Sequence, residues 1–238
     1  MAAVIRSFDI GKVYMPKVSH TTKTFENTLQ AVKSKGLKVS TAKSGVTILD
    51  QNGLKANFIA PCSSSYDNLN NYSAVIKIQH GNTSFLLAGD AEAESEQEML
   101  ASGTNLKADV LKVGHHGSNS STTPSFLKAI SPKYAVISCG TGNQYGHPHK
   151  ELLNKLSSAG IQTYRTDVNG TVIFTSDGKT LTVKTLGNAI QPRAPNASDN
   201  KPSGSAQAYI GNKNSKKFHK PTCSTLPAEH NRVCFKTR

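Results

Sequence analysis

Three polar residues follow three strand-like apolar segments, and their types are those that bind metal ions. Asp90 ends the segment SFLLAGD, His115 follows DVLKVG, and His147 lies in NQYGHPH, just after YAVISC. In an α/β sheet the carboxyl ends of the strands share one edge, so residues distant in sequence can meet there. A carboxylate with two neutral imidazoles suits Zn²⁺, Mn²⁺ or Fe, and an aspartate can bridge two ions. We therefore predict a divalent metal site that contains these three residues.

Each of these residues also has a simpler interpretation. Asp90 precedes a predicted helix and could be its N-cap, His115 could be a polar loop residue, and His147 could be a turn residue before a proline. One shared sheet edge accounts for all three residues together, which favours the metal site. His116 is predicted to orient its neighbour or to face the substrate.

An acidic run follows Asp90. Alternate positions spread around a helix instead of lining one face of it. We therefore predict that the run forms a solvated helix surface; its members are Glu92, Glu94, Glu96 and Glu98.

The segments that must position these residues alternate between strand-like and helix-like patterns. Strands are expected at 13–16 and within GVTILD, ANFIAP, SAVIKIQH, TSFLLAGD, ADVLKV, YAVISC and IQTYRT, and a last hairpin within GTVIFTSDGKTLTVKTL. Helices are expected at 23–35, 91–101, 124–130 and 149–159. Hairpins followed by strand-helix-strand units predict a mixed sheet with helices packed outside it, a layered α/β architecture.

The composition changes near residue 187. Residues 187–208 are rich in Pro, Ser, Asn and Ala and predict a flexible linker. The linker would separate a domain at 1–186 from a small basic module at 209–238.

The formal charge of +13 is concentrated near the C-terminus. From Gln191 onward nine Lys or Arg stand against Asp199 and Glu229, a net +7, which leaves +6 for the first 190 residues. Positive charge attracts phosphate polyanions, but it also favours solubility, so charge alone leaves nucleic-acid binding open. No stretch approaches the roughly 20 apolar residues that cross a bilayer, so no transmembrane segment is expected.

Four segments together resemble the metallo-β-lactamase-fold domain of the competence protein ComEC and its soluble relatives. They are SFLLAGDAEAESEQEML, LKADVLKVGHHGSNSSTTPSFLKAISPKYAVIS, QYGHPH and TYRTDVNGTVIF, within a likeness that covers residues 1–186. The resemblance implies an αββα sandwich, metal-dependent hydrolysis at a two-metal site of Zn or Mn, and a nucleic-acid substrate degraded during DNA uptake.

The resemblance also implies roles for individual residues. Asp90 matches the bridging carboxylate, and His115 and His147 match the histidines of the His-His-Gly-Ser and Tyr-Gly-His-Pro motifs. His116 is placed with Asp90 and His115 in the catalytic group. Asn71, Arg165 and Asp167 match positions of the family that lie next to the metal ligands and support them.

The family's His-x-Asp-x-Asp-His cluster does not occur in this sequence. The resemblance therefore implies either an N-terminally truncated domain that lacks its first strands or a degenerate homologue, and in both cases impaired activity.

The segment YIGNKNSKKFHKPTCSTLPAEHNRV resembles the start of an Ada-like zinc-binding module. In that pattern Cys223 and His219 match zinc ligands, and the absence of a later Cys-x-x-Cys implies an incomplete module. Relatives with such a tail are commonly exported, which favours an extracytoplasmic or secreted location.

Two other functions stay open. One is a non-catalytic nucleic-acid or surface-binding module in which the basic tail contacts phosphates. The other is hydrolysis of a small phosphate or ester, because a fold does not fix its chemistry.

Overall fold

The structure is a computed structural model that describes residues 1–187 together with the backbone of residues 208–212, 218–219 and 232–236. The chain divides into two compact units, Met1–Gln191 and Pro192–Arg238. In the second unit, β12 (Ala208–Asn212) pairs antiparallel with β13 (Phe218–His219) and with β14 (Arg232–Lys236). Within the described part of the chain, no helix is long and apolar enough to cross a membrane.

Two of the predictions for the C-terminal region lie outside this description. Almost all of the predicted linker at 187–208 falls there, and so does the expected zinc ligand Cys223. The side chain of the other expected ligand, His219, is also outside the description, although its backbone belongs to β13. The zinc-binding tail therefore stays a prediction.

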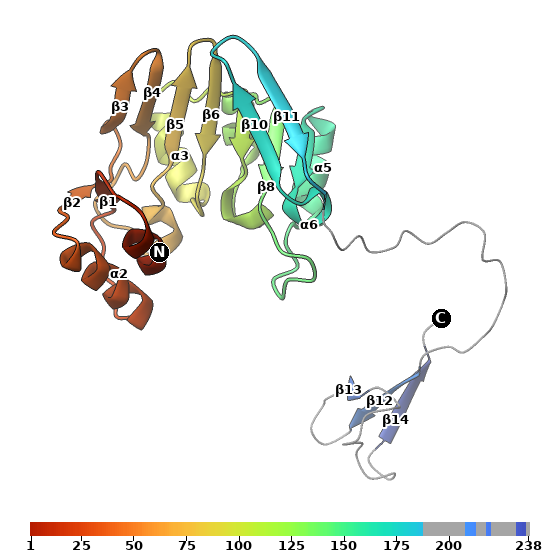
Figure 1. The fold of residues 1–238 in the computed structure, drawn as a ribbon. Helices are drawn as coiled ribbons and strands as arrows, with labels where there is room; N and C mark the ends of the chain where they lie inside the picture. The colour runs from red at the N-terminus through yellow and green to blue at the C-terminus, as the bar shows by residue number, and fades with distance from the viewer. Residues whose placement is uncertain (188–207, 213–217, 220–231, 237–238) are drawn as a thin grey trace. The chain divides into compact units, whose positions relative to one another are not determined.

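A seven-stranded mixed sheet lies at the centre of the first unit (Figure 1). The first four strands pair antiparallel, and β6 to β9 pair parallel, so the predicted mixed sheet is confirmed. In spatial order the strands are β3 (Thr47–Gln51), β4 (Leu54–Phe58), β5 (Ile76–His80), β6 (Thr83–Leu87), β7 (Val110–Lys112), β8 (Tyr134–Ile137) and β9 (Gln162–Arg165).

Three helices cover one face of this sheet, because each connects one parallel strand to the next. They are α3 (Ala93–Ala101), α4 (Pro124–Ile130) and α5 (Lys150–Ser158). Their apolar sides join the inward residues of the strands in one core, in which Leu86, Leu111 and Phe126 are fully buried. The start of α4 is fixed locally, since the Thr123 hydroxyl accepts from the Phe126 amide and Pro124 opens the helix.

A hairpin of β10 (Val172–Ser176) and β11 (Leu181–Thr185) covers part of the other face and follows the short helix α6 (Thr166–Asn169). The Phe174 ring packs against the rings of Tyr134, Tyr164 and Phe85, with centroids 5.3, 5.9 and 6.4 Å away. These aromatic contacts attach the hairpin to the sheet where the strands become parallel.

The N-terminal segment forms a small group of its own. Helices α1 (Ala2–Ser7) and α2 (Lys23–Ser34) accompany the parallel strands β1 (Val13–Met15) and β2 (Val39–Thr41). A separate cluster of Ile5, Ala31 and Val32 holds the two helices together. The Tyr14 and Phe58 rings, 5.2 Å apart, connect β1 to β4 of the large sheet.

Candidate active site

The three predicted ligands follow three neighbouring parallel strands. Asp90 comes after β6, His115 lies in the short helix η2 (Gly114–Gly117) after β7, and His147 lies in the loop after β8. The His115 and His147 rings are 5.6 Å apart, and His116 Nε2 lies 3.6 Å from Asp90 Oδ1. The sheet edge thus brings together residues from three separate segments of the sequence.

The two adjacent histidines have an unusual backbone. His115 and His116 have φ,ψ angles of 45°, 45° and 54°, 19°, in the left-handed region that residues other than glycine rarely adopt. The turn is held by a hydrogen bond from the His115 amide to the Gly89 carbonyl, 3.0 Å, and one from the Ser118 amide to the His115 carbonyl, 2.9 Å. Strained backbone of this kind is concentrated at functional sites, where it aims side chains.

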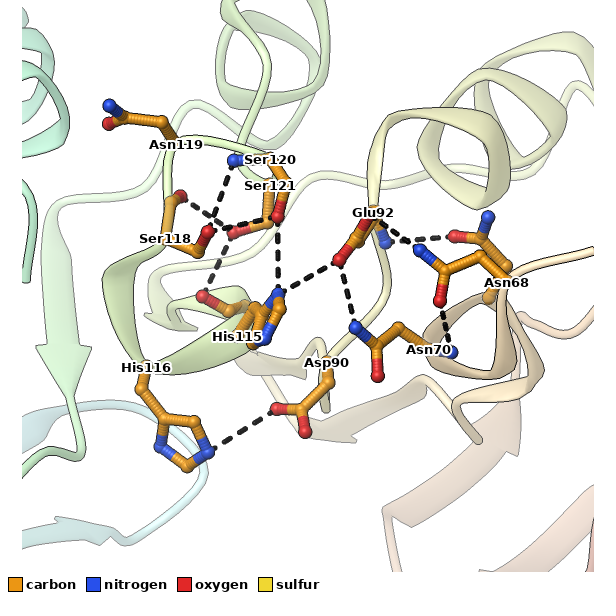
Figure 2. Close-up of polar contacts among 12 residues, drawn as sticks. Asn68, Asn70, Asp90, Glu92, His115, His116, Ser118, Asn119, Ser120 and Ser121 are labelled. Carbon is orange, nitrogen blue, oxygen red and sulfur yellow. Dashed lines mark hydrogen bonds and ion pairs between the residues drawn. The ribbon is translucent and has the colours of Figure 1, made fainter. Parts of the chain in front are cut away.

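His116 is oriented as a metal ligand would be. Its Nδ1 lies 2.7 Å from the Ser138 carbonyl oxygen, and because a carbonyl only accepts, Nδ1 must carry the proton. In the neutral ring Nε2 then offers its lone pair on the side of Asp90 (Figure 2). Metal-bound histidines are commonly fixed by such a bond from the other ring nitrogen. Both side chains are open to solvent, 51% exposed for His116 and 44% for Asp90.

His115 belongs to a second acid-histidine pair. Its Nδ1 lies 3.0 Å from Glu92 Oε1 and 3.2 Å from the Ser120 hydroxyl. Glu92 is itself held by amides, accepting from Asn68 Nδ2 at 2.9 Å and from Asn70 Nδ2 at 2.8 Å (Figure 2). A carboxylate on Nδ1 fixes the ring and leaves Nε2 available for a ligand. His115 is therefore oriented by Glu92 and not by Asp90.

The prediction that the acidic run is a solvated surface holds for Glu94, which is exposed, and is wrong for Glu96, which is buried, and for the half-buried Glu92 and Glu98. Glu96 is only 1% exposed and accepts from the Thr122 and Thr123 amides at 2.5 and 2.8 Å. Glu98 accepts from the hydroxyls of Tyr66 and Ser63, and burial, together with this bond to Glu98, raises the pKa of Tyr66 to about 12. Glu92, Glu96 and Glu98 face protein because α3 starts at the sheet edge, where the neighbouring loops supply hydrogen-bond donors to them.

Asn71, predicted to support the ligands, lies in the short helix η1 (Leu69–Tyr72) and is 2% exposed. Its side chain donates to Glu94 at 2.7 Å and accepts from the Glu92 amide at 3.0 Å. The neighbouring Ser73 hydroxyl accepts from the Asp90 amide at 2.9 Å. The segment from 68 to 73 thus holds the chain that leads from Asp90 into α3.

Arg165 and Asp167 form a bidentate ion pair after β9. Arg165 Nε lies 3.0 Å from Asp167 Oδ1 and Nη2 lies 2.5 Å from Oδ2. Between them, the Thr166 hydroxyl bonds both the amide and the carbonyl of Cys139, and Asp167 also bonds the Cys139 thiol. The pair therefore supports the end of β8, just before the loop that carries His147.

The bond from Arg165 lowers the pKa of Asp167, so this carboxylate stabilises the fold above its unfolded pKa. That stabilisation is lost as the pH falls from about 4 through the lowered pKa. We expect Asp167→Asn to cost about 1–2 kcal/mol at pH 7 and less at pH 3. Urea unfolding of both proteins at the two pH values measures this, and an equal cost at both would contradict it.

A further histidine, His149, lies beside His147 at this edge. Burial lowers the pKa of His147, and the neighbouring imidazoles of His149 and His115 lower it further, so its ring is neutral near pH 7. His149 Nδ1 accepts from the Asn119 amide at 3.0 Å, and its ring lies 4.8 Å from that of His147. His149 was assigned only to a helix from the sequence, although its position two residues after His147 was a usable signal.

The donor types fit a divalent ion such as Zn²⁺ or Mn²⁺. Across the described residues, however, no three His, Cys, Asp or Glu side chains are grouped closely enough to enclose one. The edge instead carries two pairs, His116 with Asp90 and His115 with Glu92. In the pair of His116 and Asp90, the ring nitrogen Nε2 and the carboxylate lie side by side, and neither forms a hydrogen bond with another described residue. These two residues therefore fit as the first contacts for an ion.

Comparisons with known proteins agree with this architecture. The sequence profile of the metallo-beta-lactamase superfamily matches residues 65–141, which include Asp90 and both adjacent histidines. ComE operon protein 3 of Bacillus subtilis is 37% identical over 171 residues, 72% of this chain and 22% of that protein. Competence protein ComA of Neisseria gonorrhoeae is 37% identical over 51% of this chain and 18% of that protein. Recombination protein 2 of Haemophilus influenzae is 41% identical over 43% of this chain and 13% of that protein.

The fold and these matches define a protein of the metallo-β-lactamase fold. More narrowly, the chain is ComEC-like, as the four sequence segments predicted. It spans about a fifth or less of the length of the curated relatives described here.

Proposed function

We propose that this chain belongs to a divalent-metal-dependent hydrolase that cleaves phosphodiester bonds in nucleic acid. The observation that carries the proposal is the geometry of His116, whose Nδ1 proton is fixed on the Ser138 carbonyl while Nε2 faces Asp90. Relatives named as competence and recombination proteins support a substrate of this kind.

In this proposal Asp90 and His116 hold the ion, and His115 and His147 are the next donors at the same edge. A bound divalent ion supplies a water of lowered pKa and positive charge for the phosphate. Glu92 keeps the His115 ring in place through Nδ1, and the Ser138 carbonyl keeps the proton of His116 away from Asp90. A site for two ions of Zn or Mn, which Asp90 would help to hold, is part of the proposal.

We also propose that this chain binds metal weakly and turns over slowly. Among the described residues no third ligand side chain is grouped with His116 and Asp90, whereas zinc in proteins is held by three or four ligands. A zinc titration that gave tight stoichiometric binding together with rapid cleavage would contradict this part of the proposal.

Replacing Asp90 with asparagine tests the site itself. The amide keeps the shape but removes the negative charge, so we expect Mn²⁺ and Zn²⁺ affinity to fall at least about tenfold and any cleavage of a labelled oligonucleotide to fall with it. Isothermal titration and gel assays on the full chain measure the two effects. Asp50→Asn is the matched control, because Asp50 is 62% exposed and pairs only with Lys55 on the surface sheet edge among the contacts described. Equal metal affinity in the Asp90 and Asp50 variants would rule out the assignment.

The basic C-terminal region favours a second candidate, a nucleic-acid binding module without catalysis. In that case DNA affinity would fall steeply with salt and would be the same in the Asp90→Asn variant. A small phosphodiester cleaved as readily as an oligonucleotide would favour the third candidate, a hydrolase of small phosphates or esters. The extracytoplasmic location stays a prediction.

A further inference from the structure

A small pocket opens beside the candidate metal site. Its volume is about 200 Å³, below the roughly 300–1,000 Å³ of pockets that hold a whole ligand. It therefore suits one group of a larger substrate. The residues that line it are His116, Cys139, Gly140, Asn143, Tyr145 and His147.

Tyr145 presents a flat aromatic surface at this pocket. Its ring stacks on that of His147, with centroids 5.7 Å apart and planes inclined by 22°. The residue is nevertheless 80% exposed, so most of its surface is free of protein contact. An aromatic face that is supported on one side and open on the other can accept a second flat ring.

The loop that carries Tyr145 is fixed by one asparagine. Asn143 Oδ1 accepts from the amides of Tyr145 at 3.2 Å and His147 at 3.0 Å. Its Nδ2 donates to the carbonyls of Gly140 at 3.0 Å and His147 at 2.5 Å. Because the loop is already ordered, a ligand that stacks on Tyr145 loses little binding energy to ordering it.

We propose that Tyr145 and this pocket form a subsite for one nucleobase of a single-stranded nucleic acid, next to the bond that is cleaved. The proposal rests on the proposed function and names its substrate as single-stranded. Proteins that bind single strands without sequence preference stack the bases on exposed aromatic side chains, since every base has a flat face. Cleavage would accordingly show little base preference at this position.

The chain contains no tryptophan, so Tyr145→Trp creates a single fluorescent reporter at the subsite. The full chain in EDTA, where cleavage is stopped, is titrated with a short single-stranded oligodeoxynucleotide and with an abasic strand of the same length. We expect the strand with bases to quench the emission saturably and the abasic strand to leave it unchanged. Phe8→Trp is the control, because Phe8 is 64% exposed and lies in the N-terminal segment.

Tyr145→Ala gives an independent readout by fluorescence anisotropy of labelled strands, at a salt concentration that weakens phosphate contacts. We expect its Kd for the strand with bases to rise about 5- to 150-fold, and its Kd for the abasic strand to be unchanged. Strand binding that neither quenches the Tyr145→Trp protein nor weakens in Tyr145→Ala would overturn the subsite but leave the hydrolase proposal standing. Failure of every variant and the native chain to bind the strands would overturn both.

Discussion

Replacing Gly117 with alanine is expected to destabilise the first unit by about 2–5 kcal/mol and to displace the His115-His116 turn. Gly117 has φ +87°, and a Cβ added there would lie 2.6 Å from Pro148 Cβ and 3.1 Å from Leu152 Cδ2. The turn after β7 and the loop after β8 therefore touch at a position that has room for hydrogen only. The Gly117 carbonyl also accepts from the His149 amide at 3.0 Å, which ties the same two segments together.

The matched control is Gly103→Ala. Gly103 has a similar φ of +70°, but a Cβ there would meet nothing within 4 Å. Gly103→Ala therefore adds only the strain of a left-handed backbone, which is expected to cost about 1–2 kcal/mol of stability. Urea unfolding gives both costs, and imidazole NMR signals report whether the histidines at the edge move. If the two variants were equally destabilised and the signals stayed in place, the close contact between Gly117 and Pro148 would be excluded.

Replacing Glu96 with alanine is expected to cost about 3–5 kcal/mol of folding free energy. Its two carboxylate oxygens accept from the Thr122 and Thr123 amides, and Lys155 Nζ donates to the Thr122 carbonyl at 2.6 Å. Removing the carboxylate leaves buried donors unpaired, at about 1–3 kcal/mol each, and leaves a cavity between α3 and α4. Burial raises the pKa of Glu96. Alanine offers no oxygen to either of the two amides.

Gln97→Ala is the control for Glu96→Ala, because Gln97 is exposed on the same helix and its loss is expected to change stability by less than about 0.5 kcal/mol. Glu96→Gln separates charge from geometry: its single oxygen can serve one amide, so it should fall between the two. A Glu96→Ala protein as stable as Gln97→Ala would show that the buried network does not hold the loop from 118 to 123.

Local signals were enough to predict most of the strands and helices. The prediction for 124–130 matches α4 at both ends, because a threonine cap and a proline fix its start. The expected strands SAVIKIQH and TSFLLAGD contain β5 and β6, which pair antiparallel. Helix α1 was missed, since six residues are too short to show a helical repeat.

The meeting of Asp90, His115 and His147 could be predicted from the order of the strands alone. The two acid-histidine pairs, His116 with Asp90 and His115 with Glu92, could not be predicted, because they depend on the positive φ of His115 and His116, for which the sequence carries no local signal. The role of Glu96 was missed for a related reason. Its partners lie 26 and 27 positions away, and only the packing of α3 against the next loop brings them near.

The asparagines of η1 have one more effect. Asn68, Asn70 and Asn71 bind the carboxylates of Glu92 and Glu94 with neutral amides, so they orient these groups without cancelling their charge. In a chain with a formal charge of +13, the carboxylates of Glu92 and Glu94 thus lie together with Asp90 at one edge of the sheet. A group of carboxylates of this kind attracts cations locally. Added salt should therefore slow the capture of a divalent ion here, because screening acts on this local field before it acts on the contacts that retain the ion.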